Sequence, residues 1–461
     1  MERTIEKLTF MMKDVAEFKF KGVSSDPVKL SFFEYFYIFT LIIYTGHANK
    51  YVVSTSILDN PIWFSLVIIL GGILALKWRI VFNKQFYLLI FGYLIYFVAI
   101  SIKFHEFRPT FFLNNAFLFF ISYSAVKALK ADFFRIYEFT MFYLAIIGLI
   151  MWVVQIILGG DNLYNYFGQI SSIEDFSYVS GNGLNAILYS VQPTAMSVQF
   201  DFLPPRNCGF AWEPGGFAVM LSVAVFINLF FFKGSKGSKL RFWILLIALI
   251  TSQSTTGYVI LLVILMFYFY NKQKKLIIVL WPLILIVLLL VFSLPFMSQK
   301  IVSLFDETEN MEIMVEGSIG REESINPQRF VSFLISFRDF MENPVLGLGG
   351  INEERWTYKI GANVSTITGI GNLLATYGIV GFLFFVIYSF RASAFYSKQF
   401  SYTGKTLFFI IIIFISISYG IILLPLIMSF WLFGYFTPSG IPENRIEKRD
   451  LVIGSEKLIP K

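Results

Sequence analysis

The stretch PPRNCGFAWEPGGFAVML, residues 204–221, places an arginine, Arg206, and a glutamate at the edge of a long apolar run. Proline is favoured at the first position of a helix, where its missing N–H would have no partner, so we predict that a helix begins at Pro214. Glu213 then lies at the positive end of the helix dipole. Gly215 has no side chain, which leaves room for another group to approach the backbone.

Arg206 and Glu213 are open to two interpretations. In the first, Glu213 caps the helix and Arg206 is its counterion at the surface. In the second, arginines and one carboxylate line a pocket. Arginine binds phosphate oxygens through two parallel hydrogen bonds and keeps its charge when partly desolvated. A carboxylate beside a bound diphosphate can accept a proton from an attacking hydroxyl, so the second interpretation is a site of group transfer.

The composition of the chain indicates a polytopic membrane protein. Of its 461 residues, 56% are hydrophobic and 15% are charged, and the mean hydropathy is +0.69; soluble proteins carry roughly 25% charged residues. The formal charge of +7 comes from Lys and Arg in short connections between apolar runs, which argues against nucleic acid as a partner. One cysteine, Cys208, and two histidines, His47 and His105, fit neither a zinc nor a haem site by their spacing. We therefore expect no metal site and no cofactor.

We predict one all-α integral membrane domain over residues 1–461, with about twelve transmembrane helices. The candidate spans are 31–50, 61–77, 85–103, 110–126, 133–158, 211–232, 240–254, 256–271, 276–295, 367–390, 405–420 and 422–437. The last two form one apolar stretch that could instead be a single tilted helix. Connections rich in Lys and Arg are typical of cytoplasmic loops, and they recur at 77–84, 127–135, 233–241, 271–275 and 391–405.

Alternation of these basic connections places both termini in the cytoplasm. Residues 1–30 have apolar side chains at helical spacing among lysines, which predicts an amphipathic N-terminal segment on the membrane surface. A solvated tail explains the segment equally well. Residues 438–461 form a basic cytoplasmic tail. The connection 103–109 falls on the extracytoplasmic side, where its Lys103 and Arg108 fit the charge rule poorly.

Two long loops, 159–210 and 296–366, are predicted on the extracytoplasmic side. The second begins with an acidic run, which is a solvated surface or, less strongly supported, a cation site. The sequence NPQRFVSFLISFRDFMENP follows. Asn326 is suited to cap a helix whose first residue is Pro327, and the pair Asn343-Pro344 is suited to end it.

The helix predicted in the second long loop is amphipathic. Arg329 and Arg338 lie on opposite edges of its apolar stripe, so the two arginines need not serve the same site. We expect the helix to lie on the outer membrane surface. The stripe consists of Phe330, Phe333, Leu334, Phe337, Phe340 and Met341.

Four segments together resemble the bacterial O-antigen and capsular polysaccharide polymerases and the related O-antigen ligases. The first is R-x-x-G-F-x-x-E-P-x-x-x-A at 206–218, and the second is TSQSTTG at 251–257. The third runs from Arg329 through NPVLGLG at 343–349, and the fourth is NLLATYGIVG at 372–381. The likeness covers roughly residues 200–390, and the order of the segments is more specific than any one of them.

The resemblance implies a membrane glycosyltransferase of the GT-C type in the bacterial plasma membrane, with its active site on the extracytoplasmic side. It would transfer a growing glycan from polyprenyl diphosphate to the non-reducing end of another lipid-linked repeat unit, without a metal. The implied partners are the lipid-linked donor and acceptor and membrane lipids, with a chain-length-regulating copolymerase as an optional further partner. The implied catalytic residues are Glu213, Arg206 and Arg329, and the implied substrate-binding residues are Arg338, Arg355, Lys359, Asn372 and Gly215.

The chain departs from the family pattern at Thr255, where arginine is common, and departs from the ligases at a second place. Ligases usually carry a histidine just before the helix of the fourth segment, whereas this sequence has none between residues 106 and 461, and Ile367, Thr368 and Gly371 occupy that neighbourhood. The second departure favours a polymerase.

Two other functions are alternatives. A transporter of lipid-linked oligosaccharides would tend to show an internal repeat, which is not apparent. A structural envelope protein would tolerate the loss of Arg206 and Glu213.

Other carboxylates could also carry function. Glu34 and Glu138 lie within or near predicted spans, where carboxylates often face the protein interior and serve a site. Pairing between helices explains them equally well. Asp59, in the first extracytoplasmic connection, is a minor alternative to Glu213 as the base.

Overall fold

The computed structural model describes residues 30–46, 61–170, 184–185, 188–191, 204–273, 310–321, 324–325 and 327–436. Some predicted features lie outside these residues. They are the N-terminal segment 1–29, Asp59, most of the loop 159–210, the span 276–295, Asn326 and the tail 438–461.

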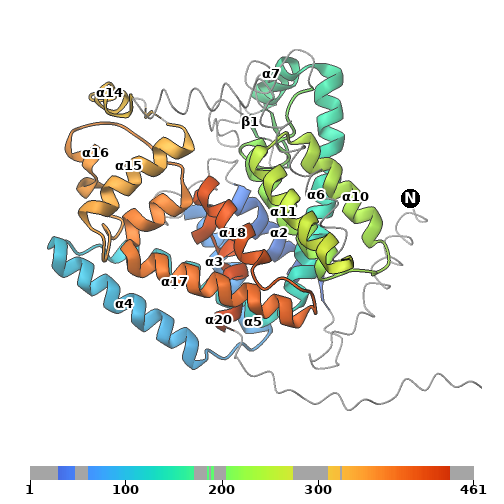
Figure 1. Cartoon of the computed structure of the whole chain (residues 1–461), viewed down its shortest axis with the longest axis horizontal. Helices are drawn as coiled ribbons and strands as arrows, with labels where there is room; N and C mark the ends of the chain where they lie inside the picture. The colour runs from blue at the N-terminus through green and yellow to red at the C-terminus, as the bar shows by residue number, and fades with distance from the viewer. Residues whose placement is uncertain are drawn as a thin grey trace, which may run out of the picture. The chain divides into compact units, whose positions relative to one another are not determined.

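The described part of the chain is almost entirely helical (Figure 1). Among the described residues, five helices are long and apolar enough to cross a membrane: α4 (Lys84–Phe104), α5 (Pro109–Leu129), α6 (Asp132–Leu158), α11 (Thr255–Lys272) and α17 (Gly369–Gln399). Shorter apolar helices are α2 (Phe32–Gly46), α3 (Pro61–Lys77), α9 (Pro214–Phe230), α10 (Ser238–Thr251) and α18 (Leu407–Ser418). Two strands, β1 (Leu184–Asn185) and β2 (Ser190–Val191), pair over two residues each. The prediction of an all-α membrane protein is confirmed.

The two long loops contribute short helices. α7 (Gly160–Ile170) belongs to the first loop, and α14 (Met311–Glu316), α15 (Arg329–Glu342), η2 (Asn352–Glu354) and α16 (Trp356–Lys359) belong to the second. Figure 1 shows α14, α15 and α16 grouped near one end of α4 and of α17. The helices of the second loop therefore gather at one end of the membrane helices.

α9 begins at Pro214, as predicted, and is buried along almost its whole length between α6, α10 and α11. The close approach of α11 depends on Gly257, because a Cβ there would lie 2.7 Å from the Cβ of Ala218. The end of α9 that carries Glu213 is thereby held at a defined place in the helix bundle.

α17 is broken at Gly378, whose φ of 62° and ψ of −161° are not helical. The turn that follows α15 enters this break, and it supplies four backbone hydrogen bonds. They are Leu348 N to Ala375 O (2.8 Å), Gly349 N to Thr376 O (2.8 Å), Ile379 N to Pro344 O (2.8 Å) and Val380 N to Val345 O (3.4 Å). Gly347 has a φ of 69°, and a Cβ there would meet the backbone of Thr376 at 2.6 Å. Gly347 of the third segment is therefore required for this contact. α17 also continues to Gln399, beyond the predicted span 367–390, since a helix need not end with its apolar run.

The apolar stretch near the C-terminus forms several short helical pieces instead of one tilted or two short helices. After α18 come η3 (Gly420–Leu423), α19 (Pro425–Trp431) and α20 (Phe433–Phe436). Tyr419 is extended, with φ −141° and ψ 139°. Leu424, which precedes Pro425, is also extended, with φ −74° and ψ 146°, as expected because proline disfavours a helical residue before it.

Two carboxylates in the membrane helices pair with basic residues of neighbouring helices. Glu138 accepts from Nε of Arg241 at 2.7 Å and from Nδ2 of Asn228 at 2.7 Å. Glu34 pairs with Lys77 at 2.6 Å. Pairing between helices therefore accounts for both carboxylates.

The basic connection 103–109 packs against the second long loop. Nζ of Lys103 donates to Oδ1 of Asn343 at 2.5 Å, and Arg108 forms an ion pair with Glu353 at 2.7 Å. These contacts explain why two basic residues lie in this connection. Their charges are matched by polar groups of the loop beside them.

Candidate active site

Glu213 is the N-cap residue of α9 by its backbone, which is extended with φ −148° and ψ 158°. Its side chain makes no capping hydrogen bond. The carboxylate instead accepts from Nη2 of Arg329 at 2.5 Å, and the two residues form an ion pair. The interpretation of Glu213 as a side-chain cap with Arg206 as its counterion is therefore wrong, because the carboxylate is directed to a residue of the second long loop.

Arg329 is the first residue of α15. The helix starts later than predicted, with Gln328 as its N-cap and Pro327 before it, because Gln328 is extended with a ψ of 157°. α15 ends at Glu342 with Asn343 as its C-cap, as predicted. Burial disfavours the charge of Arg329, but Tyr419 and Glu213 outweigh this effect and raise the pKa of the guanidinium above its ordinary value.

The apolar stripe of α15 faces outwards. Phe330, Phe337 and Met341 are exposed, whereas the opposite face of the helix is buried. The buried face consists of Val331, Ser332, Ile335, Ser336 and Asp339. An exposed phenylalanine stripe is the arrangement expected of a helix that lies in a membrane interface, with Arg329 at its start.

Tyr419 completes this cluster and was not among the predicted residues. Nη2 of Arg329 donates to the Tyr419 hydroxyl at 2.9 Å, and the guanidinium carbon lies 4.3 Å from the centre of the Tyr419 ring. The ring is buried and meets that of Trp212 edge-on at 5.6 Å. Arg329 is therefore held by a carboxylate, a hydroxyl and an aromatic face.

The Tyr419 hydroxyl occupies the space that a side chain at position 215 would need. A Cβ at Gly215 would lie 1.7 Å from the Tyr419 hydroxyl and 3.4 Å from Oε1 of Glu213. At Gly216 a Cβ would lie 2.7 Å from the Trp212 ring. The room that the sequence predicted for an approaching group is thus occupied by the protein's own tyrosine.

The segment that carries Arg206 is anchored to the turn between α10 and α11. Asn207 bonds Thr251 twice, through its backbone N–H and through Nδ2, at 3.0 Å each. Nε of Arg206 donates to the Ser252 carbonyl at 3.4 Å. At the start of α11, the Thr256 hydroxyl lies 3.0 Å from the Ser418 hydroxyl. The TSQSTTG segment therefore positions Arg206 and contacts the residue next to Tyr419.

Arg206 and Glu213 both act electrostatically on Cys208, which lies between them in sequence. Burial raises the pKa of the Cys208 thiol to about 12, so the residue is a neutral thiol and no nucleophile. Among the residues that the structure describes, Arg206 has no carboxylate partner. About a third of the Arg329 and Glu213 side chains is exposed, 34% and 31%, so an anion can reach the cluster.

A family model described as O-antigen ligase matches residues 240–386. This match supports membership of the O-antigen polymerase and ligase superfamily over these residues. The matched range contains Arg329 but ends before Tyr419, and it begins after Arg206 and Glu213. No curated protein matches the chain. The match and the apolar helices of the described part together indicate a membrane protein of O-antigen polymerase or ligase type.

Two further predicted residues, Arg355 and Asn372, line one cavity of about 220 Å³. Arg355 donates to the buried Asp339 at 2.8 Å and to Thr366 at 3.1 Å. Asn372 accepts from Thr366 at 2.7 Å and from Ser336 at 3.2 Å. The positive charge of Arg355 is thus balanced inside the protein, and the cavity presents neutral hydrogen-bonding groups.

Arg338 and Lys359 lie apart from the Glu213 cluster. Arg338 is 47% exposed, pairs with Glu312 at 3.5 Å and lies 4.1 Å from the Trp356 ring. Lys359 is 48% exposed and pairs with Glu354 at 3.0 Å. The two arginines of α15 therefore serve different places, as the helical spacing allowed. Within the described ranges no three His, Cys, Asp or Glu side chains are grouped to hold a metal.

Proposed function

We propose that this protein is a glycosyltransferase that polymerises lipid-linked repeat units of a surface polysaccharide, an O-antigen or a capsule. The observation that carries the proposal is the cluster of Glu213, Arg329 and Tyr419, with Arg206 near enough to act electrostatically on Tyr419. Two arginines and one carboxylate, partly exposed at the start of a membrane helix, suit the transfer of a sugar from a lipid diphosphate.

In the proposed reaction an acceptor hydroxyl attacks the anomeric carbon of the donor glycan. The bond between that carbon and the diphosphate oxygen breaks, and its electron pair leaves with polyprenyl diphosphate. Arg206 and Arg329 stabilise the charge that develops on the leaving group. Glu213 orients Arg329 and accepts the hydroxyl proton, so the reaction needs no metal and inverts the anomeric carbon.

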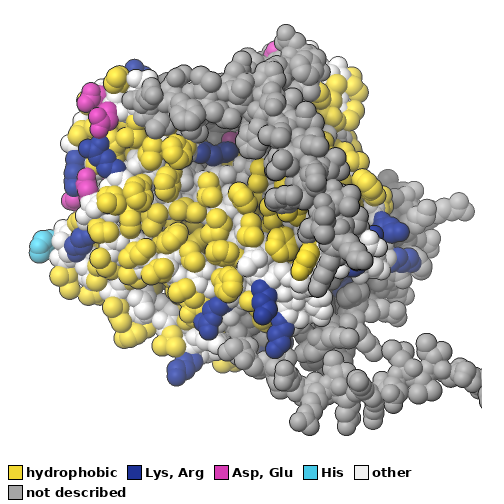
Figure 2. All heavy atoms as spheres, in the orientation of Figure 1, with side chains coloured by type: hydrophobic (Ala, Val, Ile, Leu, Met, Phe, Trp, Pro, Cys, Tyr) yellow, Lys and Arg dark blue, Asp and Glu magenta, His cyan; other side chains and the backbone are white. Residues whose placement is uncertain are grey.

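The proposed topology has about twelve transmembrane helices in a GT-C-like arrangement, with both termini in the cytoplasm. α9 places Glu213 at one end and the basic connection 233–241 at the other. Figure 2 is consistent with this arrangement, since hydrophobic side chains cover the middle of the visible face and Lys and Arg lie along its lower edge. The active site would then face the extracytoplasmic side of the bacterial plasma membrane.

A polymerase fits the chain better than a ligase. Where ligases carry a histidine, Thr368 is buried as the N-cap of α17. A Cβ at Gly369 would lie 2.2 Å from the Tyr419 carbonyl oxygen, and one at Gly371 would lie 2.5 Å from a methyl carbon of Thr368. An imidazole at Gly369 would therefore collide with the backbone of Tyr419, and one at Gly371 would collide with Thr368.

The remaining predicted residues are proposed to contact substrate away from the reacting atoms. Arg355 and Asn372 would bind sugar hydroxyls, Arg338 and Lys359 would lie at the rim, and Gly215 would act through Tyr419. The partners are the donor and acceptor polyprenyl-diphosphate-linked oligosaccharides and membrane lipids. A chain-length-regulating copolymerase is an optional further partner.

The proposal is tested by the ladder of surface glycans. Cells in which the wild-type protein is deleted are supplied with the Arg206→Ala or the Glu213→Gln variant. Matched controls are Arg321→Ala and Glu316→Gln, since both residues are exposed. We expect the two site variants to accumulate single repeat units, and the controls to restore the full ladder at equal expression.

Other outcomes point to other functions. Full-length polymer that stays on the lipid carrier would identify a ligase. Repeat units retained on the cytoplasmic leaflet would identify a transporter. A normal ladder in both site variants would contradict the assignment of the site.

A further inference from the structure

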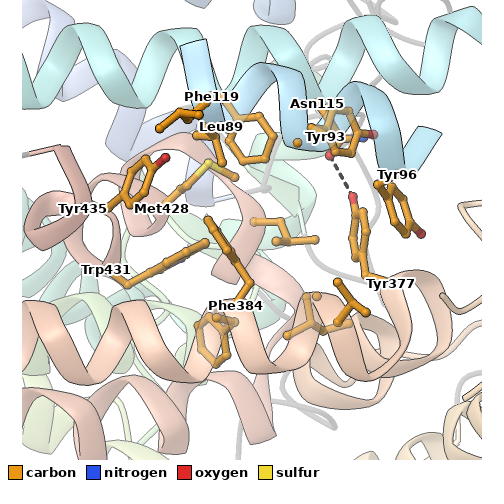
Figure 3. Close-up of a pocket in the computed structure, with 17 residues that line it drawn as sticks. Leu89, Tyr93, Tyr96, Asn115, Phe119, Tyr377, Phe384, Met428, Trp431 and Tyr435 are labelled. Carbon is orange, nitrogen blue, oxygen red and sulfur yellow. Dashed lines mark hydrogen bonds between the residues drawn. The ribbon is translucent and has the colours of Figure 1, made fainter. Parts of the chain in front are cut away.

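A second cavity, of about 290 Å³, lies between α4, α5, α17, α19 and α20. Figure 3 shows side chains of α4 and α5 on one side of it and side chains of α17, α19 and α20 on the other. Its walls are almost entirely apolar. The aromatic part of the lining includes Tyr93, Tyr96, Phe119, Tyr377, Phe384 and Trp431.

The polar atoms on these walls already have partners within the protein. The Tyr377 hydroxyl donates to Oδ1 of Asn115 at 2.8 Å, and the Tyr96 hydroxyl lies 2.8 Å from the Thr376 carbonyl oxygen. Trp431 donates to a backbone carbonyl at 2.8 Å, and so does Tyr435. A ligand in the cavity would therefore find no hydrogen-bonding group to satisfy, which fits a hydrocarbon and excludes a sugar or a phosphate.

The cavity opens sideways towards the surface that faces lipid. Leu88 of α4 and Val380 of α17 line it and are 53% and 49% exposed. Large apolar side chains beside them, among them Phe91 and Leu383, are exposed as well. In a membrane protein an exposed apolar face contacts acyl chains, so a hydrocarbon can enter from the bilayer.

One face of α4 carries residues that line this cavity together with the cationic side chain of Lys103. Leu89, Gly92 and Tyr96 line the cavity, and Lys103 follows Tyr96 at a spacing of i, i+7, which keeps it on the same side of the helix. Lys103 bonds Asn343 and the Gly347 carbonyl. Among the described residues it has no carboxylate within ion-pairing distance. An amphiphile with an anionic head and a hydrocarbon tail matches this order of groups.

α17 links the apolar cavity to the polar one. Leu373 and Tyr377 line the apolar cavity, and Asn372 and Thr376 line the cavity that contains Arg355. The polar cavity adjoins Ser336 of α15, which lies about 10 Å along that helix from Arg329 at a rise of 1.5 Å per residue. A glycan whose lipid carrier occupies the apolar cavity can thus extend through the polar cavity towards the reacting centre.

We propose that the apolar cavity binds the isoprenoid chain of the acceptor, a second polyprenyl-diphosphate-linked glycan. Its diphosphate lies at Lys103 and its first sugars lie at Asn372 and Arg355. The donor occupies Arg206 and Arg329. This assignment rests on the proposed function, because a polymerase must hold two lipid-linked substrates at once.

The test uses the full-length protein in lipid nanodiscs and a polyprenyl diphosphate whose isoprenoid chain carries a diazirine. After irradiation, we expect label on peptides from α4, α5 and α17. Gly92→Phe should fill the mouth of the cavity, since a Cβ at Gly92 meets no atom within 4 Å. Loss of two buried methylenes corresponds to about tenfold weaker labelling.

Gly72→Phe is the matched control, because Gly72 is also a helical glycine with no atom within 4 Å of its Cβ and lines neither cavity. It should label as the wild type does. Wild-type label on other peptides, or equal labelling of the two phenylalanine variants, would overturn the proposal. If phosphatidylglycerol reduced the labelling as strongly as unlabelled polyprenyl diphosphate does, the cavity would bind an ordinary phospholipid and the proposal would be wrong.

Labelling and polymerisation are measured separately so that the two proposals fail independently. Glu213→Gln should label normally and form no polymer. If it polymerises, the proposed function is wrong and the labelling still decides the cavity. If Gly92→Phe polymerises with an unchanged KM for the acceptor, the cavity assignment is wrong and the proposed function stands.

Discussion

Substitution of Gly215 by alanine tests whether Tyr419 positions the catalytic pair. The added Cβ would lie 1.7 Å from the Tyr419 hydroxyl oxygen, whereas ordinary contacts begin near 3.4 Å. The tyrosine must therefore move away from α9. Its hydrogen bond from Arg329, 2.9 Å long, cannot survive a displacement of this size.

The cost follows from the kind of bond that is lost. A hydrogen bond to a charged group contributes about 1.5–3 kcal/mol. At about 1.4 kcal/mol for each factor of ten, Gly215→Ala should reduce kcat/KM by about 10- to 100-fold. Tyr419→Phe removes the same hydrogen bond and should cause a loss of similar size, while its ring still packs against Trp212.

The double variant Gly215→Ala/Tyr419→Phe separates this explanation from a general disturbance of α9. Phenylalanine lacks the hydroxyl that is 1.7 Å away, and the remaining contact, to Cζ, is 3.0 Å. The double variant should therefore lose no more kcat/KM than Tyr419→Phe alone. Initial rates are measured with purified protein and a lipid-linked repeat unit, and Gly72→Ala is the control for a methyl group in open space.

Two results would refute the reasoning. Wild-type activity in Gly215→Ala would show that Tyr419 does not need its present position. A double variant whose loss equals the product of the two single losses would show that the sites are independent.

Two further predictions concern stability and reactivity. Asp339→Asn should lower the free energy of unfolding by about 3 kcal/mol, because it leaves Arg355 without its buried charged partner. Thermal unfolding in detergent measures this loss. A loss no larger than that of the exposed control Glu342→Gln would contradict the prediction. For Cys208, with a pKa of about 12, maleimide labelling of the native protein should keep rising with pH through 9, since the neutral thiol prevails until the pH nears 12. The denatured chain should level off near the ordinary pKa of about 8.5, and levelling of the native protein there would show that the thiol is exposed.

The start of α9 could be predicted because its signals are local. Pro214 favours a helix start, and the extended backbone of Glu213 follows from its position before that proline. The partner of the Glu213 carboxylate could not be predicted, because Arg329 is 116 residues away and no local pattern relates them. The sequence predicted the two charged types at one site but not the ion pair between them.

Tyr419 was missed because it lies in an apolar stretch that reads as membrane helix. A signal was present, since the run ISISYG at 415–420 interrupts the stretch with polar residues and a glycine. Asp339 was missed for a different reason. It lies on the polar face of an amphipathic helix, where a carboxylate is expected to meet solvent, and its burial depends on the folding of η2 and α16 over that face.

The insertion of residues 344–349 into the break of α17 has a consequence for how this protein can be divided. At this point the second long loop and α17 satisfy each other's backbone groups. Loop N–H groups donate to carbonyls of α17, and N–H groups of α17 donate to carbonyls of the loop. Unpaired backbone groups are costly where water is scarce. A chimera between two such proteins must therefore exchange the loop and the first half of α17 as one block, and substrate specificity carried by the loop is inherited together with that helix.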